Sequence, residues 1–295
     1  MKKSIFILVA FIIFKPSFAG NYIFNEETSK AVSLIDKNQW FLEVEQLAAF
    51  NRYYKGEEII RARDFITGIF NEIGLQTRLE EININNIKGH NIIGEIIGSE
   101  KPEEIYIVGA HYDSISEKPY RAAPGAEDNA SGTAGLFALA RALRENPPKA
   151  TVRFVAFSGE EAGLFGSIQH VKNIVDAHDK HKVRGVLIMD MIAFSQDDIL
   201  DILIETSSAN EELIALLTAS AQKYSTARIS STFNYWGSDH EPFINNGFNA
   251  ALVIEKDYEN YPHYHRSTDV PQNLNKNMAH ELLKTLAGAL GFWVY

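Results

Sequence analysis

The chain contains no cysteine among its 295 residues, so its chemistry must come from other side chains. The absence of cysteine excludes disulfide bonds, a thiol nucleophile and any metal site with cysteine ligands. If the protein binds a metal, its ligands must therefore be histidine, aspartate or glutamate.

The sequence also lacks an excess of positive charge. Asp and Glu number 38 against 28 Lys and Arg, which gives a formal net charge of −10, and the basic residues form no continuous run. Because an acidic protein repels phosphate backbones, we expect no nucleic-acid partner.

Only one apolar segment suggests a membrane or export signal, and it lies at the amino terminus. Lys2 and Lys3 precede the apolar stretch 4–14, and Ser17-Phe-Ala19 places small residues before Gly20. This pattern is typical of a secretory signal peptide, since the apolar stretch is too short to span a bilayer. Cleavage after residue 19 would remove three lysines and no acid, which takes the formal net charge from −10 to −13. We therefore expect a periplasmic or extracellular protein with no stable membrane association after signal removal.

The remainder of the chain alternates between strand-like and helix-like segments, and 45% of the residues are hydrophobic, enough to bury a large core. Strands are expected at 91–97, 105–110, 151–157, 183–189, 199–204 and 250–254. Helices are expected within 20–55, at 57–73, between Gly132 and Pro147, and at 163–178, 210–223 and 274–293. This alternation predicts an α/β fold, a single three-layer α/β/α domain with a mainly parallel central mixed sheet. We divide the chain into a signal peptide (1–19), an N-terminal lead-in (20–40) and one domain (41–295).

Acidic and histidine side chains follow the ends of several of these expected strands. His111 ends one strand, Asp190 ends another, and Glu160-Glu161 follow a third. Each alone is weak evidence of a site. In a parallel sheet, however, the carboxyl ends of the strands meet at one edge, where α/β proteins bind their ligands. The sequence therefore predicts a metal site at this edge.

Two aspartates near these positions have open interpretations. Asp113 stands two residues after His111, so in an extended segment its carboxylate could accept a hydrogen bond from the imidazole and orient the ring. Asp128 lies in the glycine-rich stretch Pro124–Gly132, where it is either a solvated helix N-cap or a carboxylate shared by two metals. The same stretch contains the glycosylation sequon Asn129-Ala-Ser131, which we interpret as a coincidence because a glycan would block the site.

The remaining candidates divide between metal binding and proton transfer. Of the adjacent acids Glu160 and Glu161, one can bind a metal while the other serves as a general base. Asp190 is flanked by two methionines in a strand that is expected to be buried, so its charge needs a metal or a salt bridge. His265 and His263 are equally suitable ligands on chemical grounds alone.

Taken together, these motifs resemble those of the secreted zinc aminopeptidases of peptidase family M28, the group typified by the bacterial leucyl aminopeptidases. The resemblance extends from about residue 40 to the carboxyl terminus. The motifs that carry it are Val108–Ser114, Pro124–Gly132, Phe157–Gly163, Met189–Met191, Gly237–Phe243 and His265–Asp269.

The resemblance implies two Zn²⁺ ions per chain. Asp128 would bridge the ions, His111 and Asp190 would complete one site, and Glu161 and His265 would complete the other. The family's last ligand stands four residues before an aspartate, which selects His265 over His263. Histidine and carboxylate ligands alone would also suit manganese or cobalt, so zinc rests on the resemblance.

The resemblance also implies an activity, the removal of the N-terminal residue from peptides. Two ions would polarise the scissile carbonyl and hold water as hydroxide, and Glu160 would be the general base that later protonates the departing amine. Tyr235, three residues before Ser238, would help to stabilise the oxyanion. Peptide substrates with a free N-terminus are expected, because the α-amine would lie among the site carboxylates.

Some features depart from this pattern or suit another function. Asn51–Lys55 differs from the segment expected before the first long helix, so that edge of the pocket is undetermined. A glutaminyl cyclase with a single zinc is the main alternative, and Asp239–Phe243 suits it. A non-catalytic binding module on the same fold is a second alternative. All five ligands and Glu160 are present, which favours the peptidase.

Overall fold

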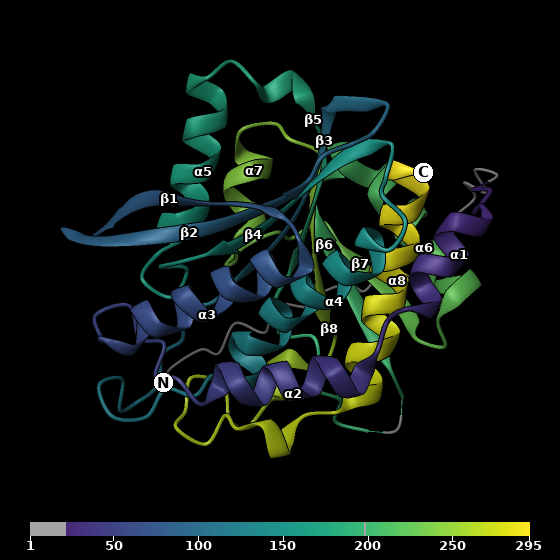
Figure 1. Ribbon diagram of the computed structural model, residues 1–295. Helices are drawn as coiled ribbons and strands as arrows, with labels where there is room; N and C mark the ends of the chain where they lie inside the picture. Colours follow the sequence, from purple (N-terminus) through teal and green to yellow (C-terminus); the bar gives the residue numbers. More distant parts are fainter. Residues whose placement is uncertain (1–21, 198) are drawn as a thin grey trace, which may run out of the picture.

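The computed structural model describes residues 22–197 and 199–295, so the signal peptide expected at 1–19 lies outside the described residues. An eight-stranded sheet is covered by helices on both faces (Figure 1). Its strands are β1 (Gln76–Ile84), β2 (Ile87–Ile96), β3 (Lys101–His111), β4 (Ala150–Phe157), β5 (Val183–Met189), β6 (Asp201–Thr206), β7 (Arg228–Thr232) and β8 (Ala250–Glu255). The α-helices are α1 (Glu26–Ser33), α2 (Lys37–Ala48), α3 (Glu58–Ile73), α4 (Gly132–Arg144), α5 (Phe165–Asp176), α6 (Glu211–Tyr224), α7 (His240–Asn245) and α8 (Lys276–Val294).

The sheet is mixed, with a parallel centre. Its strand order is β1-β2-β4-β3-β5-β8-β6-β7. The neighbouring pairs β4-β3, β3-β5 and β5-β8 are parallel, whereas β2 runs antiparallel to β4 and β6 antiparallel to β8. The carboxyl ends of the four central strands therefore lie at one edge of the sheet. The expected α/β fold with a mainly parallel mixed sheet is confirmed.

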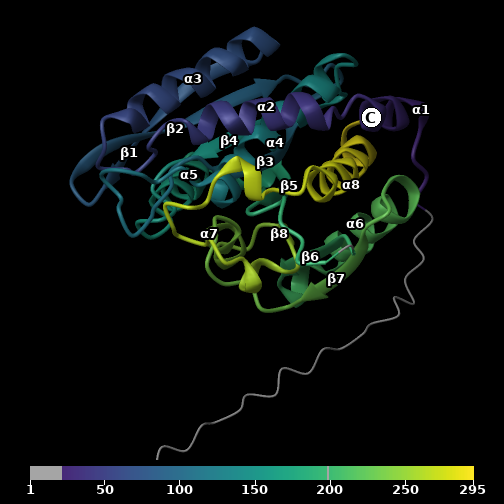
Figure 2. The same cartoon turned by 90° about the horizontal axis from the view of Figure 1, so that it is seen from below.

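The two faces of the sheet carry separate apolar cores. Helices α1, α2, α3, α4, α6 and α8 cover one face, where Trp40, Phe70 and Phe137 are fully buried (Figure 2). Helices α5 and α7 cover the other face, where Phe157 and Phe243 pack together at 6.2 Å between ring centroids. Because Trp40 of α2 lies within the first core, the helices before residue 50 share that core with the rest of the domain.

Three elements had no signal in the sequence. Strand β1 is mostly exposed, β7 has only five residues, and α7 has only six, so none shows the apolar periodicity of a longer buried element. The helix predicted at 57–73 is present as α3 and ends at Gly74, whose φ of 86° is the left-handed conformation expected of a C-cap.

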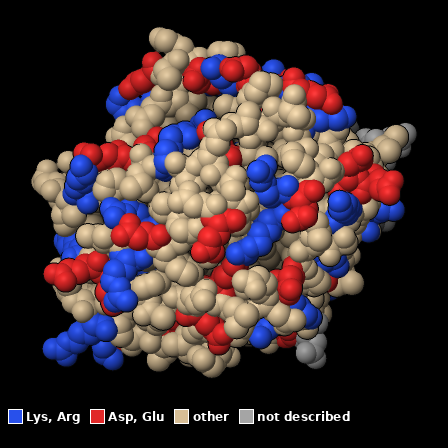
Figure 3. All heavy atoms as spheres, in the orientation of Figure 1, with Lys and Arg blue, Asp and Glu red and all other residues tan. Residues whose placement is uncertain are grey.

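Within the described part of the chain, no helix is long and apolar enough to cross a bilayer. On the face drawn in Figure 3, Lys and Arg are interspersed with Asp and Glu.

Candidate metal centre

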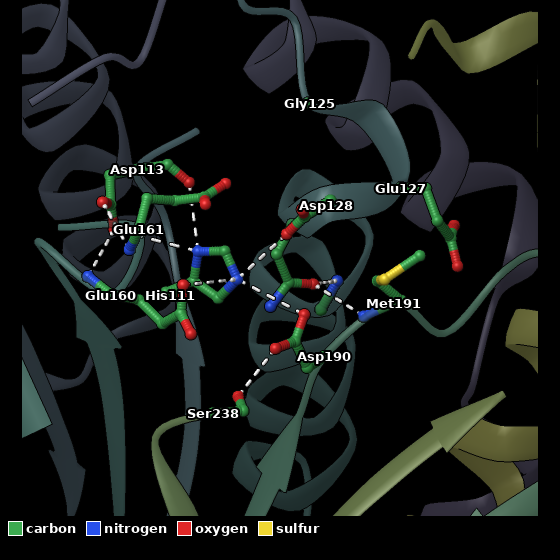
Figure 4. Close-up of polar contacts among 12 residues, drawn as sticks. His111, Asp113, Gly125, Glu127, Asp128, Glu160, Glu161, Asp190, Met191 and Ser238 are labelled. Carbon is green, nitrogen blue, oxygen red and sulfur yellow. Dashed lines mark hydrogen bonds and ion pairs between the residues drawn. The ribbon is translucent and has the colours of Figure 1, made fainter. Parts of the chain in front are cut away.

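The sheet brings together residues that lie far apart in the sequence. His111 is the last residue of β3, Asp190 follows β5 directly, and Glu160 and Glu161 follow β4 in a short loop. Because β4, β3 and β5 are adjacent and parallel, these side chains meet at the carboxyl edge of the sheet (Figure 4). His111 and Asp190 come within 3.3 Å although 79 residues separate them.

Five predicted ligands form two groups of three that share Asp128. In the first group, His111 Nε2 lies 3.2 Å from Asp128 Oδ1 and 3.3 Å from Asp190 Oδ1. In the second, His265 Nε2 lies 3.1 Å from Asp128 Oδ2 and 3.0 Å from Glu161 Oε2. Within each group, the potential ligand atoms all lie within 4.8 Å of one another. Asp128 thus presents one carboxylate oxygen to each group.

The chemistry of this donor set fits two divalent cations. Imidazole nitrogens and carboxylate oxygens are ligands that Zn²⁺ binds. Glu161 Oε1 is buried without a hydrogen-bond partner. Burial, followed by the charge of Asp128, raises the pKa of Glu161 to about 8, although His265 and His111 act in the opposite direction. Bound divalent cations would stabilise the ionised form of the carboxylates that meet here.

Glu160 lies beside the two groups without belonging to either. Its Oε2 atom is 4.0 Å from His111 Nε2. Burial raises the pKa of Glu160, and the neighbouring Asp190 carboxylate adds to this effect, while His111 opposes it. A carboxylate with a raised pKa next to a metal site is suited to accept and return a proton.

Asp113 makes different contacts from those expected of it. The Nδ1 atom of His111 lies 3.1 Å from the backbone oxygen of Asp113 and 3.8 Å from its carboxylate oxygen. The carboxylate instead accepts hydrogen bonds from the backbone N–H groups of Glu160, at 3.2 Å, and Glu161, at 3.3 Å. The strand ends at His111, so the extended geometry assumed for the two side chains does not continue to Asp113. The main chain of Asp113 therefore holds the ring, and its carboxylate holds the Glu160-Glu161 loop.

The turn that carries Asp128 depends on Arg52, a residue that the sequence did not single out. This turn, η1 (Ala126–Ser131), is kinked by the non-helical backbone of Asp128 and Asn129, and Gly125 precedes it with a φ of 50°. Arg52 is fully buried and donates hydrogen bonds to four carbonyl oxygens, including those of Gly125 at 2.7 Å and Pro124 at 2.6 Å. A Cβ at position 125 would lie only 2.3 Å from the backbone oxygen of Asp128, so the turn requires glycine. Arg52 lies in the segment whose role was undetermined from the sequence.

Asp269 and Ser238 form hydrogen bonds that position two of the predicted metal ligands. Asp269 accepts hydrogen bonds from the backbone N–H groups of Glu127, at 2.9 Å, and Asp128, at 3.1 Å. The Ser238 hydroxyl donates a 2.6 Å hydrogen bond to Asp190 Oδ2. Only long-range contacts reveal these roles, although both residues belong to motifs noted in the sequence.

The sequon asparagine also has a structural role. Asn129 is fully buried, and its side-chain nitrogen donates to the carbonyl oxygen of Met189 at 2.9 Å. The amide nitrogen is therefore inaccessible to a glycan, a reason separate from the blocked site on which the sequence interpretation relied.

His263 and Tyr235, which were candidates from the sequence, lie outside the two groups of metal ligands. The Nδ1 atom of His263 lies 2.8 Å from Thr268 Oγ1, and His263 belongs to neither group. Tyr235 stacks on Trp236 with ring centroids 5.8 Å apart, and it is not among the residues that line the adjoining cavity.

Tyr264 occupies the position next to the ligands instead. Its ring stacks on that of His265, with centroids 3.8 Å apart and planes 23° from parallel. Burial raises the pKa of the Tyr264 hydroxyl, and the carboxylates of Asp128 and Asp190 raise it further. Tyr264 also lines the cavity together with Asp128, Asp190 and His265, and about half of its surface is exposed. The only sequence signal for it was its place directly before His265.

A cavity of about 620 Å³ opens from the two groups. Such a volume accommodates a small peptide segment. It is lined by Asp128, Glu160, Asp190, Met191, Glu205, Trp236, Gly237, Ser238, Leu252, Ile254, Tyr258, Glu259, Asn260, Tyr261, Pro262, Tyr264, His265 and Arg266.

Solved structures with this fold include both peptidases and a cyclase. A structure of LapB from Legionella pneumophila superposes with a TM-score of 0.81 at 21% identity, covering 92% of this chain and 76% of that one. BSAP, a zinc aminopeptidase from Bacillus subtilis, superposes with a TM-score of 0.63 at 27% identity, covering 71% and 51%. A glutaminyl cyclase from Bacteroides thetaiotaomicron superposes with a TM-score of 0.71 at 19% identity, covering 86% and 97%, which shows a shared fold.

Sequence comparisons identify the family more specifically than the shared fold does. A probable leucine aminopeptidase from Arthroderma otae is 31% identical over 278 residues, an alignment that covers 88% of this chain and 73% of that protein. The family model for peptidase family M28 matches residues 91–290, which contain both metal groups. The chain therefore belongs to peptidase family M28, a family of hydrolases that act on peptides.

Proposed function

We propose that this protein is a dinuclear zinc aminopeptidase that removes the N-terminal residue from peptides. The observation that carries the proposal is Asp128, which offers one oxygen to each of two histidine-carboxylate groups. His111 and Asp190 would hold one ion, and Glu161 and His265 the other. The aminopeptidase names of the sequence relative and of the B. subtilis structure support the same activity.

The reaction needs an attacking water, a general base and stabilisation of the developing charge. Bound zinc ions would polarise the scissile carbonyl and lower the pKa of the attacking water. Glu160 accepts the proton of that water as its oxygen bonds to the carbonyl carbon. Glu160 then donates the proton to the amine nitrogen as the C–N bond breaks, which yields a free amino acid and a shortened peptide.

The site carboxylates also explain a preference for chain ends. Glu160 and Asp190 line the cavity, where carboxylate oxygens suit the α-ammonium group of a peptide. The same charge repels a C-terminal carboxylate. Peptides with a free N-terminus are therefore the proposed substrates.

The oxyanion requires a hydrogen-bond donor, and Tyr264 is better placed than Tyr235. Tyr264 lines the cavity and stacks on His265, whereas Tyr235 stacks on Trp236 and is absent from the lining. We assign the Tyr264 hydroxyl as the donor that stabilises charge on the carbonyl oxygen.

Metal content and two substrates together test the proposal. The purified protein should bind two equivalents of zinc, hydrolyse leucine p-nitroanilide, and leave a glutaminyl peptide uncyclised. One equivalent of zinc with ring closure and no amide hydrolysis would establish the cyclase instead. Two bound zinc ions without turnover of any peptide would favour a binding module.

We also propose that the protein is exported. The support is the sequence pattern of residues 1–19, with Lys2 and Lys3 before an apolar stretch and small residues at 17 and 19. N-terminal sequencing of the protein recovered outside the cytoplasm should begin at Gly20. Recovery of uncleaved chain in the cytoplasm alone would contradict export.

A further inference from the structure

A buried carboxylate without a partner faces the cavity at a distance from the metal groups. Glu205 on β6 is only 6% exposed, and what remains exposed lines the cavity. Among residues 22–197 and 199–295, no hydrogen bond or ion pair satisfies its carboxylate. None of the roles proposed above uses this residue.

The register of the sheet determines where Glu205 points. Glu205 is directly opposite Leu252 in the β6-β8 pair, and Leu203 is opposite Ile254. Side chains of directly paired residues lie on the same face, and alternate residues of a strand share that face. Leu252 and Ile254 both line the cavity, so Glu205 stands in an apolar wall that they form.

The distance between Glu205 and the metal groups suits a substrate whose first side chain is long. Asp190 follows β5, and β8 separates β5 from β6. Neighbouring strands are ~4.8 Å apart, so Glu205 lies on the order of 10 Å from the strand that presents Asp190. A substrate bound with its first carbonyl at the metals could reach Glu205 only with an extended side chain.

The charges around this end of the cavity are negative. Burial, followed by the charges of Asp190 and Glu259, raises the pKa of Glu205 to about 7. Arg266 is the one Lys or Arg residue among the lining residues; it is exposed and forms no ion pair with Glu205. A carboxylate in an apolar wall is unfavourable unless a partner neutralises it, and a cationic ligand would do so.

We propose that Glu205 forms the end of the subsite for the substrate's first side chain, and that the enzyme selects peptides with N-terminal lysine or arginine. The inference rests on the proposed aminopeptidase function. The apolar stem of the substrate side chain would pack on Leu252 and Ile254, and its cationic end would donate hydrogen bonds to Glu205. Leucine would fill the apolar part and leave the carboxylate unsatisfied.

The test compares aminoacyl-7-amido-4-methylcoumarin substrates with lysine, arginine or leucine, using the zinc-loaded full-length mature protein. In wild type, kcat/KM for lysine and arginine should exceed that for leucine by at least about ten-fold, as expected for one charge-assisted hydrogen bond in a desolvated pocket. In Glu205→Gln, which keeps the shape and removes the charge, the lysine-to-leucine ratio of kcat/KM should fall at least about ten-fold.

A matched control variant distinguishes a direct contact between the substrate and Glu205 from the general effect of negative charge in the cavity. Glu259→Gln removes an equal charge from an exposed position of the lining, and it should change the ratio by less than about three-fold because solvent screens it. If the two variants changed the lysine-to-leucine ratio of kcat/KM equally, the proposed contact with Glu205 would be wrong. It would also be wrong if Glu205→Gln left that ratio unchanged.

One measurement needs no variant and therefore does not depend on folding of a mutant. L-Lysinamide should inhibit the wild-type enzyme competitively with a Ki at least about ten-fold lower than that of L-norleucinamide, which has the same stem without the charge. Equal inhibition would overturn the proposal. Hydrolysis of leucine without preference for lysine would overturn only this inference, whereas no hydrolysis of any of the three substrates would overturn the proposed function itself.

Discussion

The guanidinium of Arg52 donates a 2.7 Å hydrogen bond to the carbonyl oxygen of Gly125, three residues before the aspartate shared by the two metal groups. Burial lowers the pKa of Arg52 to about 10, so the group is still charged at neutral pH. A buried cation thus holds the backbone of the metal-binding turn through hydrogen bonds to carbonyl oxygens.

Arg52→Lys should destabilise the protein and weaken metal binding. A lysine cannot reproduce the forked contacts to four carbonyls, and each unsatisfied buried carbonyl is unfavourable by ~1 kcal/mol or more, so we expect a loss of about 2–4 kcal/mol. Urea unfolding and zinc titration measure the two effects. Arg61→Lys, an exposed arginine on α3, is the control and should change stability by less than ~0.5 kcal/mol. Wild-type stability and zinc affinity in Arg52→Lys would show that the turn does not depend on this residue.

Glu160→Gln should abolish turnover while both metals stay bound. Glu160 belongs to neither metal group, so its loss removes the proton acceptor and leaves the five ligands in place. We expect kcat to fall by about 10²–10⁴. Glu161→Gln is the contrasting variant, because it changes a ligand and should lower zinc content. Turnover close to wild type in Glu160→Gln, with zinc retained, would refute Glu160 as the base.

The two tyrosines can be separated by matched variants. Tyr264→Phe should lower kcat by about 10²–10³ if its hydroxyl stabilises the oxyanion, because it removes one donor and leaves the ring stack on His265 in place. Tyr235→Phe should change kcat by less than about three-fold, since removing its hydroxyl leaves its stack on Trp236. The reverse result would return the oxyanion role to Tyr235, as the family resemblance implied.

Glu80 makes a buried pair with His170 whose contribution should depend on pH. Glu80 Oε2 lies 2.9 Å from His170 Nδ1, and Asn91 and Asn173 also donate to this carboxylate at 2.8 Å. Burial opposes the charge of Glu80, but these partners outweigh it and lower its pKa from 4.5 to about 2. Since the folded-state pKa is depressed, the stabilisation is present above pH 4.5 and is lost as the pH falls towards 2.

Glu80→Gln should therefore be least stable relative to wild type at neutral pH. The expected difference in the free energy of unfolding is about 2–3 kcal/mol at pH 7 and less than ~1 kcal/mol near pH 2. Urea unfolding between pH 2 and pH 7 measures this difference, and Glu72→Gln, at an exposed position of α3, is the control. A difference that does not change between pH 7 and pH 2 would show that the pair does not produce the lowered pKa.

Much of the fold could be predicted because its central elements are long and apolar. Strand β5 begins and ends where its apolar run predicts, and α3 ends at Gly74 as its C-cap predicts. The polar edge strand β1 and the short β7 were missed, because exposed or five-residue strands carry no strong periodic signal.

The candidate site was predictable where its residues follow strand ends, and unpredictable where distant segments meet. His111 and Asp190 come together because β3 and β5 are neighbours, which the strand-end pattern anticipates. Nothing local in the sequence indicates that Asp269 accepts the N–H of Asp128, which lies 141 residues earlier. The His111 ring lies closer to the backbone oxygen of Asp113, at 3.1 Å, than to the carboxylate predicted to orient it, at 3.8 Å, because the strand ends before Asp113.

The order of amino acids alone settles which chemistry is open to this chain: no thiol is present, and histidines and carboxylates stand at the ends of apolar segments. Tertiary structure settles which atoms meet. Strand order brings one oxygen of Asp128 to His111 and the other to His265, and the β6-β8 register turns Glu205 towards the cavity. A shift of one residue in that register would turn Glu205 to the opposite face, because side chains alternate along a strand. Local sequence does not encode such pairings, since they depend on packing between segments that are distant in the chain.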